Sequence, residues 1–320
     1  MQTMMNRTRD QMRRLWNANA PLTGASMLML AALALAVFGL AVDPRTITGM
    51  PAWMKPAKFA VSTAIFMTTL AWIFGYLPSW VRMRRIVGRA VAFILLLEVA
   101  IVYLQAWRGT TSHFNAGTPL DTTLFAVMGI AIGIQTALSA VVAIALWRQP
   151  FTDRALGWAL RLGLAISIIG ASTGGLMVSP TAAQIAEARI THRLPVSGGH
   201  TVGAPDGEPG ITGLGWSREH GDIRVPHFLG LHALQFLPLV VLAAARRGLA
   251  DAQRVRLTFV AAASYFSLFA ILLWQALRAQ SVLGPDATTL IALSIWAVVT
   301  IIMSWTIVSR HPVRLHVMVY

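Results

Sequence analysis

The densest run of chemically active side chains in the sequence is the string GWSREHGDIRVPHFLGLHALQ, which covers residues 215–235. Two imidazoles in it, those of His227 and His232, could ligate a metal or a haem iron. They stand five residues apart, which is about 140° around a regular helix, so they would not reach one ion together. Asp222 and Arg224 precede them and supply one charge of each sign.

A second string, WMKPAKF at residues 53–59, contains Lys55 and Lys58, the only lysines in the chain. Their spacing of three places both on one face of a helix, whose first turn Pro56 favours. Cations at a helix N-terminus oppose the helix dipole. We therefore expect an anion, either a ligand or an acidic side chain, to compensate them. The alternative is that both lysines reach lipid headgroups.

A third group begins with Glu98, which lies inside an apolar segment, and continues into the string QAWRGTTSHFN at residues 105–115. A charged group at the centre of a bilayer costs about 2.5–3.5 kcal/mol on insertion scales, so such a residue is a functional candidate by default. The alternative is a structural partner for a neighbouring helix. Gln105 lies about 20° from Glu98 around a helix, and His113 follows in the polar turn.

These strings define two sets of candidate residues. The ligand-binding set is Lys55, Lys58, Glu98, Gln105, Arg108, His113, Asn115, Asp222, Arg224, Gln235 and Arg278, and the metal or haem set is His113, His227 and His232. Arginine and lysine side chains suit haem propionates as well as a small anion. The patterns assign no catalytic residue.

The composition determines which elements position these residues. Of the 320 residues, 56% are apolar and only 12% are charged, against about 45–50% and 25% in soluble domains. Eight apolar segments approach the length of about 20 residues that a membrane-spanning helix needs, at residues 22–42, 58–77, 86–107, 122–147, 158–178, 227–245, 257–279 and 287–308. The sequence therefore predicts an all-α polytopic membrane protein. Because it contains no cysteine, disulfides, Cys-ligated zinc and iron–sulfur clusters are excluded.

The formal net charge of +14 falls on one side of the predicted membrane. That side, with both termini, holds 17 basic and three acidic residues, whereas the other holds nine basic and eight acidic ones. The positive-inside rule predicts a bacterial cytoplasmic (inner) membrane protein with cytoplasmic termini. Six of the eight histidines then lie outside. Nucleic-acid binding is not expected, because it needs a presentable basic surface rather than short loops against lipid.

Three pairs of strings recur in order and indicate an internal duplication. GLAVDP at 39–44 resembles GLMVSP at 175–180, KPAKF at 55–59 resembles RVPHF at 224–228, and QAWR at 105–108 resembles QALR at 275–278. We expect two parallel four-helix repeats, related by an axis along the membrane normal. The expected units are a basic N-terminus at 1–21, repeats at 22–150 and 151–309, an extracytoplasmic loop at 179–226 and a tail at 310–320.

Three local features are predicted to be structural. Gly129 and Gly133 form a GxxxG motif, and Gly170 lies in a second run of small residues, both typical of helix packing. Asp121 should cap the helix that follows the polar turn. A short helix is expected at 181–190, where the glycine-rich loop begins.

The strings WMKPAKF, QAWRGTTSHFN and GDIRVPHFLGLHALQ resemble those of uncharacterised bacterial multi-pass membrane proteins. The resemblance covers most of the chain from the second to the sixth predicted span. It implies an integral membrane protein but brings no activity, ligand or residue role with it.

The favoured hypothesis is an outward-facing polar pocket flanked by Lys58 and His227, which are equivalent under the repeat. Arg108 and Arg278 should border this pocket, with Glu98 below. It could bind a cofactor, haem b or a divalent metal, with redox chemistry, or a small anionic ligand. The alternatives are a carrier or receptor for a small anionic solute or lipid, an accessory subunit of a membrane complex, and a metal-dependent hydrolase. Whether the protein is an enzyme stays open.

Overall fold

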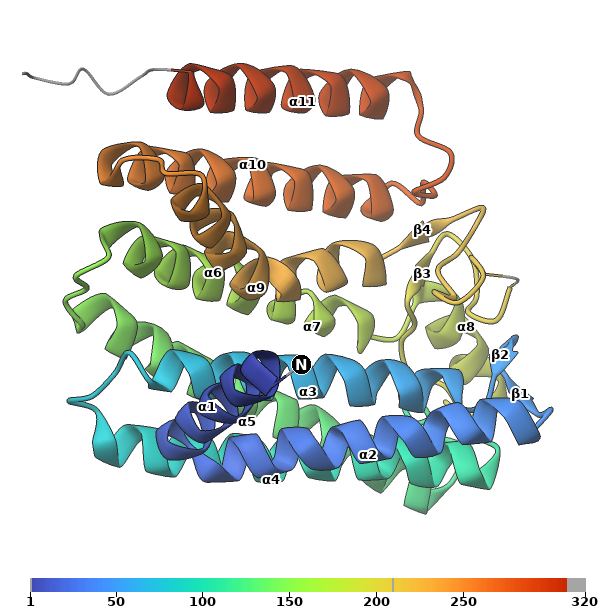
Figure 1. Cartoon of the computed structure of the whole chain (residues 1–320). Coiled ribbons are helices and arrows are strands. Elements are labelled where there is room, and N and C mark those ends of the chain that lie inside the picture. Colours follow the sequence, from blue (N-terminus) through green and yellow to red (C-terminus); the bar gives the residue numbers. More distant parts are fainter. Residues whose placement is uncertain (1, 209, 310–320) are drawn as a thin grey trace, which may run out of the picture.

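The computed structural model describes residues 2–208 and 210–309 and is built almost entirely from helices (Figure 1). Eight of these helices are long and apolar enough to cross a membrane. They are α2 (Ala20–Val42), α3 (Met54–Phe74), α4 (Val81–Arg108), α5 (Pro119–Arg148), α6 (Arg154–Ser172), α9 (Arg224–Arg246), α10 (Asp251–Leu277) and α11 (Ala287–Val308). The prediction of an all-helical, eight-span protein is confirmed at this level.

The shorter elements lie at the two ends of the long helices. They are α1 (Gln2–Ala18), β1 (Thr46–Ile47), β2 (Met50–Pro51), α7 (Gly174–Met177), α8 (Ala182–Thr191), β3 (Thr201–Val202) and β4 (Gly221–Asp222). All of them except α1 gather at one end, on the right of Figure 1, which we call the outer end. Strand β3 pairs antiparallel with β4, Thr201 opposite Asp222, and so ties the long loop to the start of α9. Helix α8 confirms the predicted short helix.

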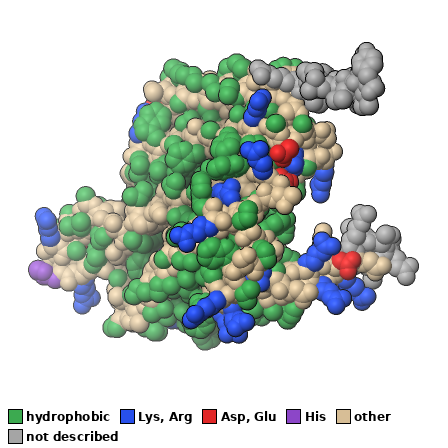
Figure 2. Space-filling model, turned by 90° about the vertical axis from the view of Figure 1, so that its left-hand side faces the viewer, with side chains coloured by type: hydrophobic (Ala, Val, Ile, Leu, Met, Phe, Trp, Pro, Cys, Tyr) green, Lys and Arg blue, Asp and Glu red, His purple; other side chains and the backbone are tan. Residues whose placement is uncertain are grey.

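The opposite end of the helices is strongly basic. Figure 2 looks onto this end and shows many basic side chains, which are arginines because both lysines lie at the outer end, with few acidic ones between them. These arginines come from the loops that the sequence assigned to one side of the membrane. We call this the basic end.

Helix starts follow ordinary capping rules, with one correction. Asp121 was expected to cap α5, but the N-cap is Thr118, whose hydroxyl accepts a hydrogen bond from the Asp121 backbone N–H at 3.1 Å. Pro119 occupies the first helical position, where its fixed φ angle and missing N–H are tolerated and so start the helix earlier. Asp121 therefore lies in the first turn, with its carboxylate available to other partners.

The apolar core contains buried side chains from every described spanning helix except α11. Helices α6 and α9 pack closely together, because a Cβ on Gly170 would lie 2.5 Å from the Cα of Gly230. Gly170 is thus a packing glycine, as predicted. Gly129 and Gly133 are not, since within the described chain nothing lies within 4 Å of a Cβ added at either. Their GxxxG face on α5 points away from the bundle.

Candidate functional site

Five polar residues of the outer end interact with one another, and we call them the outer polar cluster. They are Lys55 in the first turn of α3, Glu98 on α4, His113 in the turn after α4, His200 next to β3, and His227 in the first turn of α9. Electrostatic interactions link His113 to Lys55, His200 and His227, and link Lys55 to Glu98. The cluster thus joins the two predicted repeats.

Glu98 is the deepest member of the cluster. Its side chain is 5% exposed, and its Oε1 lies 3.6 Å from Nε2 of His113. The other carboxylate oxygen, Oε2, is buried and has no hydrogen-bond partner among the described residues. Buried polar atoms are nearly always hydrogen-bonded to protein or to ordered water, so this oxygen is available to accept a hydrogen bond from a bound water or ligand.

Lys55 faces the same region from α3. Its ammonium lies 5.7 Å from the centre of the Phe59 ring, and the described structure gives it no hydrogen bond and no ion pair shorter than 4 Å. Its electrostatic partners include Glu98 and Asp206, which attract it, and Arg224 and Lys58, which repel it. Lys55 is therefore a cation without an ion pair that interacts electrostatically with Glu98, one of whose carboxylate oxygens has no partner among the described residues.

His113 is positioned by the turn that follows α4. Its Nδ1 lies 3.1 Å from the Ser112 hydroxyl, and its ring packs edge-on against Phe59 at 5.5 Å between centroids. Burial, followed by repulsion from Lys55, lowers the pKa of His113 well below its usual value. The next residue, Phe114, has a φ of 61°, a strained conformation for a side chain of this size. This conformation directs the buried Phe114 ring against His200, 4.8 Å away.

His200 is a member of the cluster that the sequence reasoning missed. Its Nδ1 lies 2.8 Å from Oδ2 of Asp206, and its backbone N–H also donates to that carboxylate. Burial lowers the pKa of His200, and the hydrogen bond to Asp206 only partly opposes this effect. No local sequence pattern predicts the role of His200, because its position in the cluster depends on the pairing of β3 with β4.

His227 is held in one tautomer by its neighbours on α6. Its Nδ1 lies 2.9 Å from the Gly170 carbonyl and 3.2 Å from the Thr173 hydroxyl. A carbonyl only accepts, so Nδ1 carries the proton and Nε2 keeps a free lone pair.

The other predicted metal ligand, His232, packs on the Phe228 ring at 4.4 Å and interacts with Gln235. None of the described interactions joins His232 to the cluster.

Most of the other predicted site residues fix the outer loops. Lys58 donates to the Leu214 carbonyl at 2.8 Å, and Arg224 donates to the Gly215 carbonyl and forms an ion pair with Asp222, both at 2.6 Å. Lys58 and Arg224 thus attach the long loop to the starts of α3 and α9. Asn115 shapes its own turn, through a hydrogen bond to the Thr110 hydroxyl at 2.9 Å. Gln235 donates to the Thr69 hydroxyl at 3.3 Å and interacts with His232.

Arg108 and Arg278 pair locally instead of facing the cluster. Arg108 lies 2.6 Å from Asp121, which also accepts from Gln105 at 2.8 Å. Arg278 pairs with Asp286 and lies over the Trp274 ring at 4.4 Å. Each arginine thus joins the end of one helix to the start of the next. The carboxylates at the start of the following helices, Asp121 and Asp286, neutralise the charge that we expected a pocket to use.

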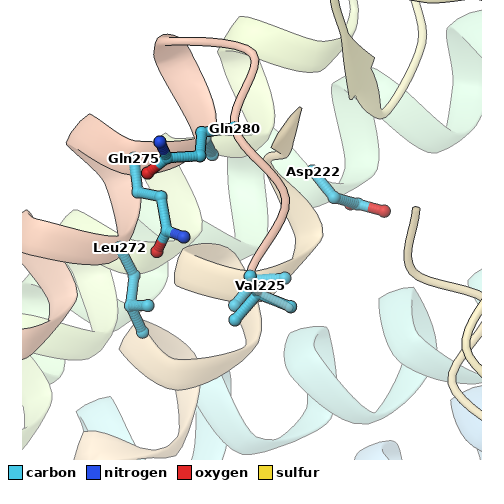
Figure 3. Close-up of a pocket in the computed structure, with 7 residues that line it drawn as sticks. Asp222, Val225, Leu272, Gln275 and Gln280 are labelled. Atoms are coloured by element: carbon cyan, nitrogen blue, oxygen red, sulfur yellow. The ribbon is translucent and has the colours of Figure 1, made fainter. Parts of the chain in front are cut away.

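One small cavity lies between the start of α9 and the end of α10. It is lined by Asp222, Val225, Gln275 and Gln280 among others. Figure 3 shows Gln275 from the last turn of α10 and Gln280 from the loop that follows it near Val225 of α9, with the Asp222 carboxylate directed away. Its volume of about 10 Å³ leaves room for roughly one water molecule. It is too small for an organic ligand. Within residues 2–208 and 210–309, no group of three or more His, Asp or Glu side chains is arranged to hold a metal ion.

Comparison with known proteins adds no family to this description. No protein-family model matches the chain, and searches of curated proteins and of solved structures gave no significant match.

Proposed function

We propose that the outer polar cluster binds a small anionic ligand that also carries a hydrogen-bond donor. Lys55 would take the anionic group, and Oε2 of Glu98 would accept from the donor. The observation that carries the proposal is that the Glu98 oxygen is buried without a partner while the neighbouring ammonium of Lys55 has no ion pair among the described residues. A ligand bridging the two would satisfy both groups.

The charge balance supports a role for Lys55 in particular. Arg224 is paired with Asp222, Asp206 is bonded to His200, and Lys58 already donates to a carbonyl. Lys55 remains, close enough to Glu98 to interact but without a direct contact. The neutral imidazoles of the cluster add donors and acceptors without adding charge.

The proposal is tested by replacing Lys55. In detergent-purified protein, inorganic phosphate and lactate should bind, as measured by calorimetry, and Lys55→Met should weaken both. A hydrogen bond to a charged group contributes about 1.5–3 kcal/mol, which corresponds to a loss of roughly 10-fold or more. Arg193→Gln removes an exposed cation from the same end and should leave binding unchanged. Absence of binding by both probes, or equal losses in the two variants, would refute the proposal.

A cofactor is the second candidate, because His113 and His227 interact across the two predicted repeats. Nε2 of His227 is free to ligate haem b or a divalent metal, and Lys55 could face a haem propionate. An absorption spectrum and a metal analysis of the purified protein decide the matter. A Soret band or stoichiometric metal, lost in His227→Ala, would establish the cofactor. Their absence would reject it.

We also propose that the chain consists of two parallel four-helix repeats. Supporting this, Gln105 and Gln275 are both buried, at 0% and 2% exposure. The backbone N–H groups of Thr110 and Gln280 donate to their carbonyls at 3.0 and 3.2 Å. The residues Gly109 and Ala279 that end α4 and α10 both have positive φ angles, of 74° and 57°. A parallel arrangement would place both copies of this helix end beside one axis, as an outward-facing site or a carrier for an anionic solute would require.

Membrane location and orientation complete the proposal. The basic end in Figure 2 supports a cytoplasmic position for both termini under the positive-inside rule. The outer polar cluster would then face the outside of a bacterial inner membrane. An accessory subunit with the same topology would instead be recognised by co-purification with a second membrane protein.

A further inference from the structure

A groove between α10 and α11 lies near the basic end, far from the outer polar cluster. It is lined by Arg256, Phe259, Val260, Met303, Thr306 and Ile307 and encloses a volume of about 330 Å³. Cavities of about 300–1,000 Å³ are typical of small-molecule sites. Five of its six lining side chains are apolar or carry only a hydroxyl group, and one is cationic. This composition suits an amphipathic molecule with an anionic end.

Hydrogen bonds between α10 and α11 flank the groove on both sides. On the side nearer the basic end, Gln253 donates to the Ile307 carbonyl at 3.0 Å. On the side nearer the bundle centre, the hydroxyls of Ser264 and Thr300 lie 2.8 Å apart, and the Trp296 indole donates to the Ser264 carbonyl at 2.8 Å. Between these points the described residues form no hydrogen bond from one helix to the other. The space is therefore part of the built structure rather than a gap between loosely placed helices.

The groove faces the lipid. Phe259 and Met303 are 43% and 47% exposed, and α11 contributes no side chain to the apolar core of the described chain. Arg256 is exposed and forms no ion pair or hydrogen bond with any described residue. The neighbouring arginines of the basic end together create a positive potential, so an unpaired arginine among them attracts an anionic group.

We propose that this groove binds a phospholipid with an anionic headgroup. Arg256 contacts the phosphate region, and one acyl chain lies along Phe259, Val260 and Met303. Anionic lipids are attracted to basic residues at the cytoplasmic membrane surface, with about 1 kcal/mol per lysine or arginine. The inference does not depend on the proposed function at the outer end.

Native mass spectrometry of protein equilibrated with mixed phosphatidylglycerol and phosphatidylcholine tests the proposal. The wild type should retain phosphatidylglycerol preferentially, and Arg256→Gln should reduce this preference by about fivefold. Arg85→Gln is the matched control, because Arg85 is also exposed at the basic end but lies on α4, away from the groove. The control should change the preference less than twofold.

A second variant tests the apolar part without changing charge. Met303→Trp fills the groove and should lower retention of both lipids, with an unchanged melting temperature reporting that the fold is intact. The proposal fails if Arg256→Gln and Arg85→Gln behave alike, or if Met303→Trp leaves retention unchanged. It also fails if Met303→Trp dissociates a dimer, since the groove would then be an interface between two copies of this chain.

Discussion

Two buried polar side chains on α4 illustrate what the partners of a single atom can reveal. Gln105 and Glu98 lie on the same helix, and both are buried. The amide of Gln105 donates to Asp121 at 2.8 Å, whereas Oε2 of Glu98 has no partner within the described chain. An unpaired polar atom in a membrane helix lowers stability. Proteins commonly accept such a cost at sites where a ligand supplies the missing partner.

The role of Glu98 predicts a selectivity that can be measured. Lactate should bind more tightly than propionate, because only lactate has a hydroxyl that can donate to Glu98. Glu98→Gln should reduce this preference by roughly tenfold, the equivalent of about 1.4 kcal/mol, while Lys55→Met should weaken both ligands alike. Calorimetry with the two acids measures the preference. Equal selectivity in wild type and Glu98→Gln would show that Glu98 does not contact the ligand.

The histidines of the outer loops predict a pH dependence of stability. Burial lowers the pKa of His113 and of His200 in the folded protein, so the unfolded chain binds more protons as the pH falls below about 6.5. Their contribution to stability is thus complete above that pH and is lost as the pH falls towards the folded-state pKa values. The melting temperature should decrease between pH 7.5 and pH 5. His113→Asn should flatten the decrease, and an unchanged slope would contradict this assignment.

Helices were easier to predict than their contacts. Eight spans follow from apolar length alone, since a bilayer imposes that length on any sequence. The partners of Arg108 and Arg278 could not be predicted in this way, because they depend on which carboxylate lies at the start of the following helix. His200 depends on a strand pairing between residues 201 and 222, which leaves no periodic signal. Sequence therefore identified the end of the molecule where polar groups meet, but only part of the group.

Glycine packing provides a matched test at the level of whole helices. Overpacking a core usually costs about 1–3 kcal/mol. Gly170→Ala should cost more than this range, because the added Cβ would meet the backbone of Gly230 at 2.5 Å. Gly129→Ala meets nothing within 4 Å and should stabilise α5 by up to about 1 kcal/mol through helix propensity. Thermal unfolding in detergent compares the two. Similar effects of both would mean that the contact between α6 and α9 is not as close as described.

The whole molecule is asymmetric in two respects that belong together. Its basic end carries the excess positive charge of the chain, and its outer end carries the imidazoles, the buried carboxylate and the long loop. A bilayer enforces the first asymmetry through the insertion rule. If the basic end is cytoplasmic, the second asymmetry would open the proposed site to the outside. Orientation would therefore determine which compartment supplies the ligand of the outer polar cluster.

The absence of native cysteine allows this orientation to be measured with single introduced thiols. Ala183 on α8 and Ser79 between α3 and α4 are both exposed and lie at opposite ends of the spanning helices. A membrane-impermeant maleimide should label Ala183→Cys in intact spheroplasts, but should label Ser79→Cys only after lysis. The cysteine-free parent gives the background. The reverse pattern would place the basic end outside, against the positive-inside rule, and the outer polar cluster would then face the cytoplasm and serve a ligand made within the cell.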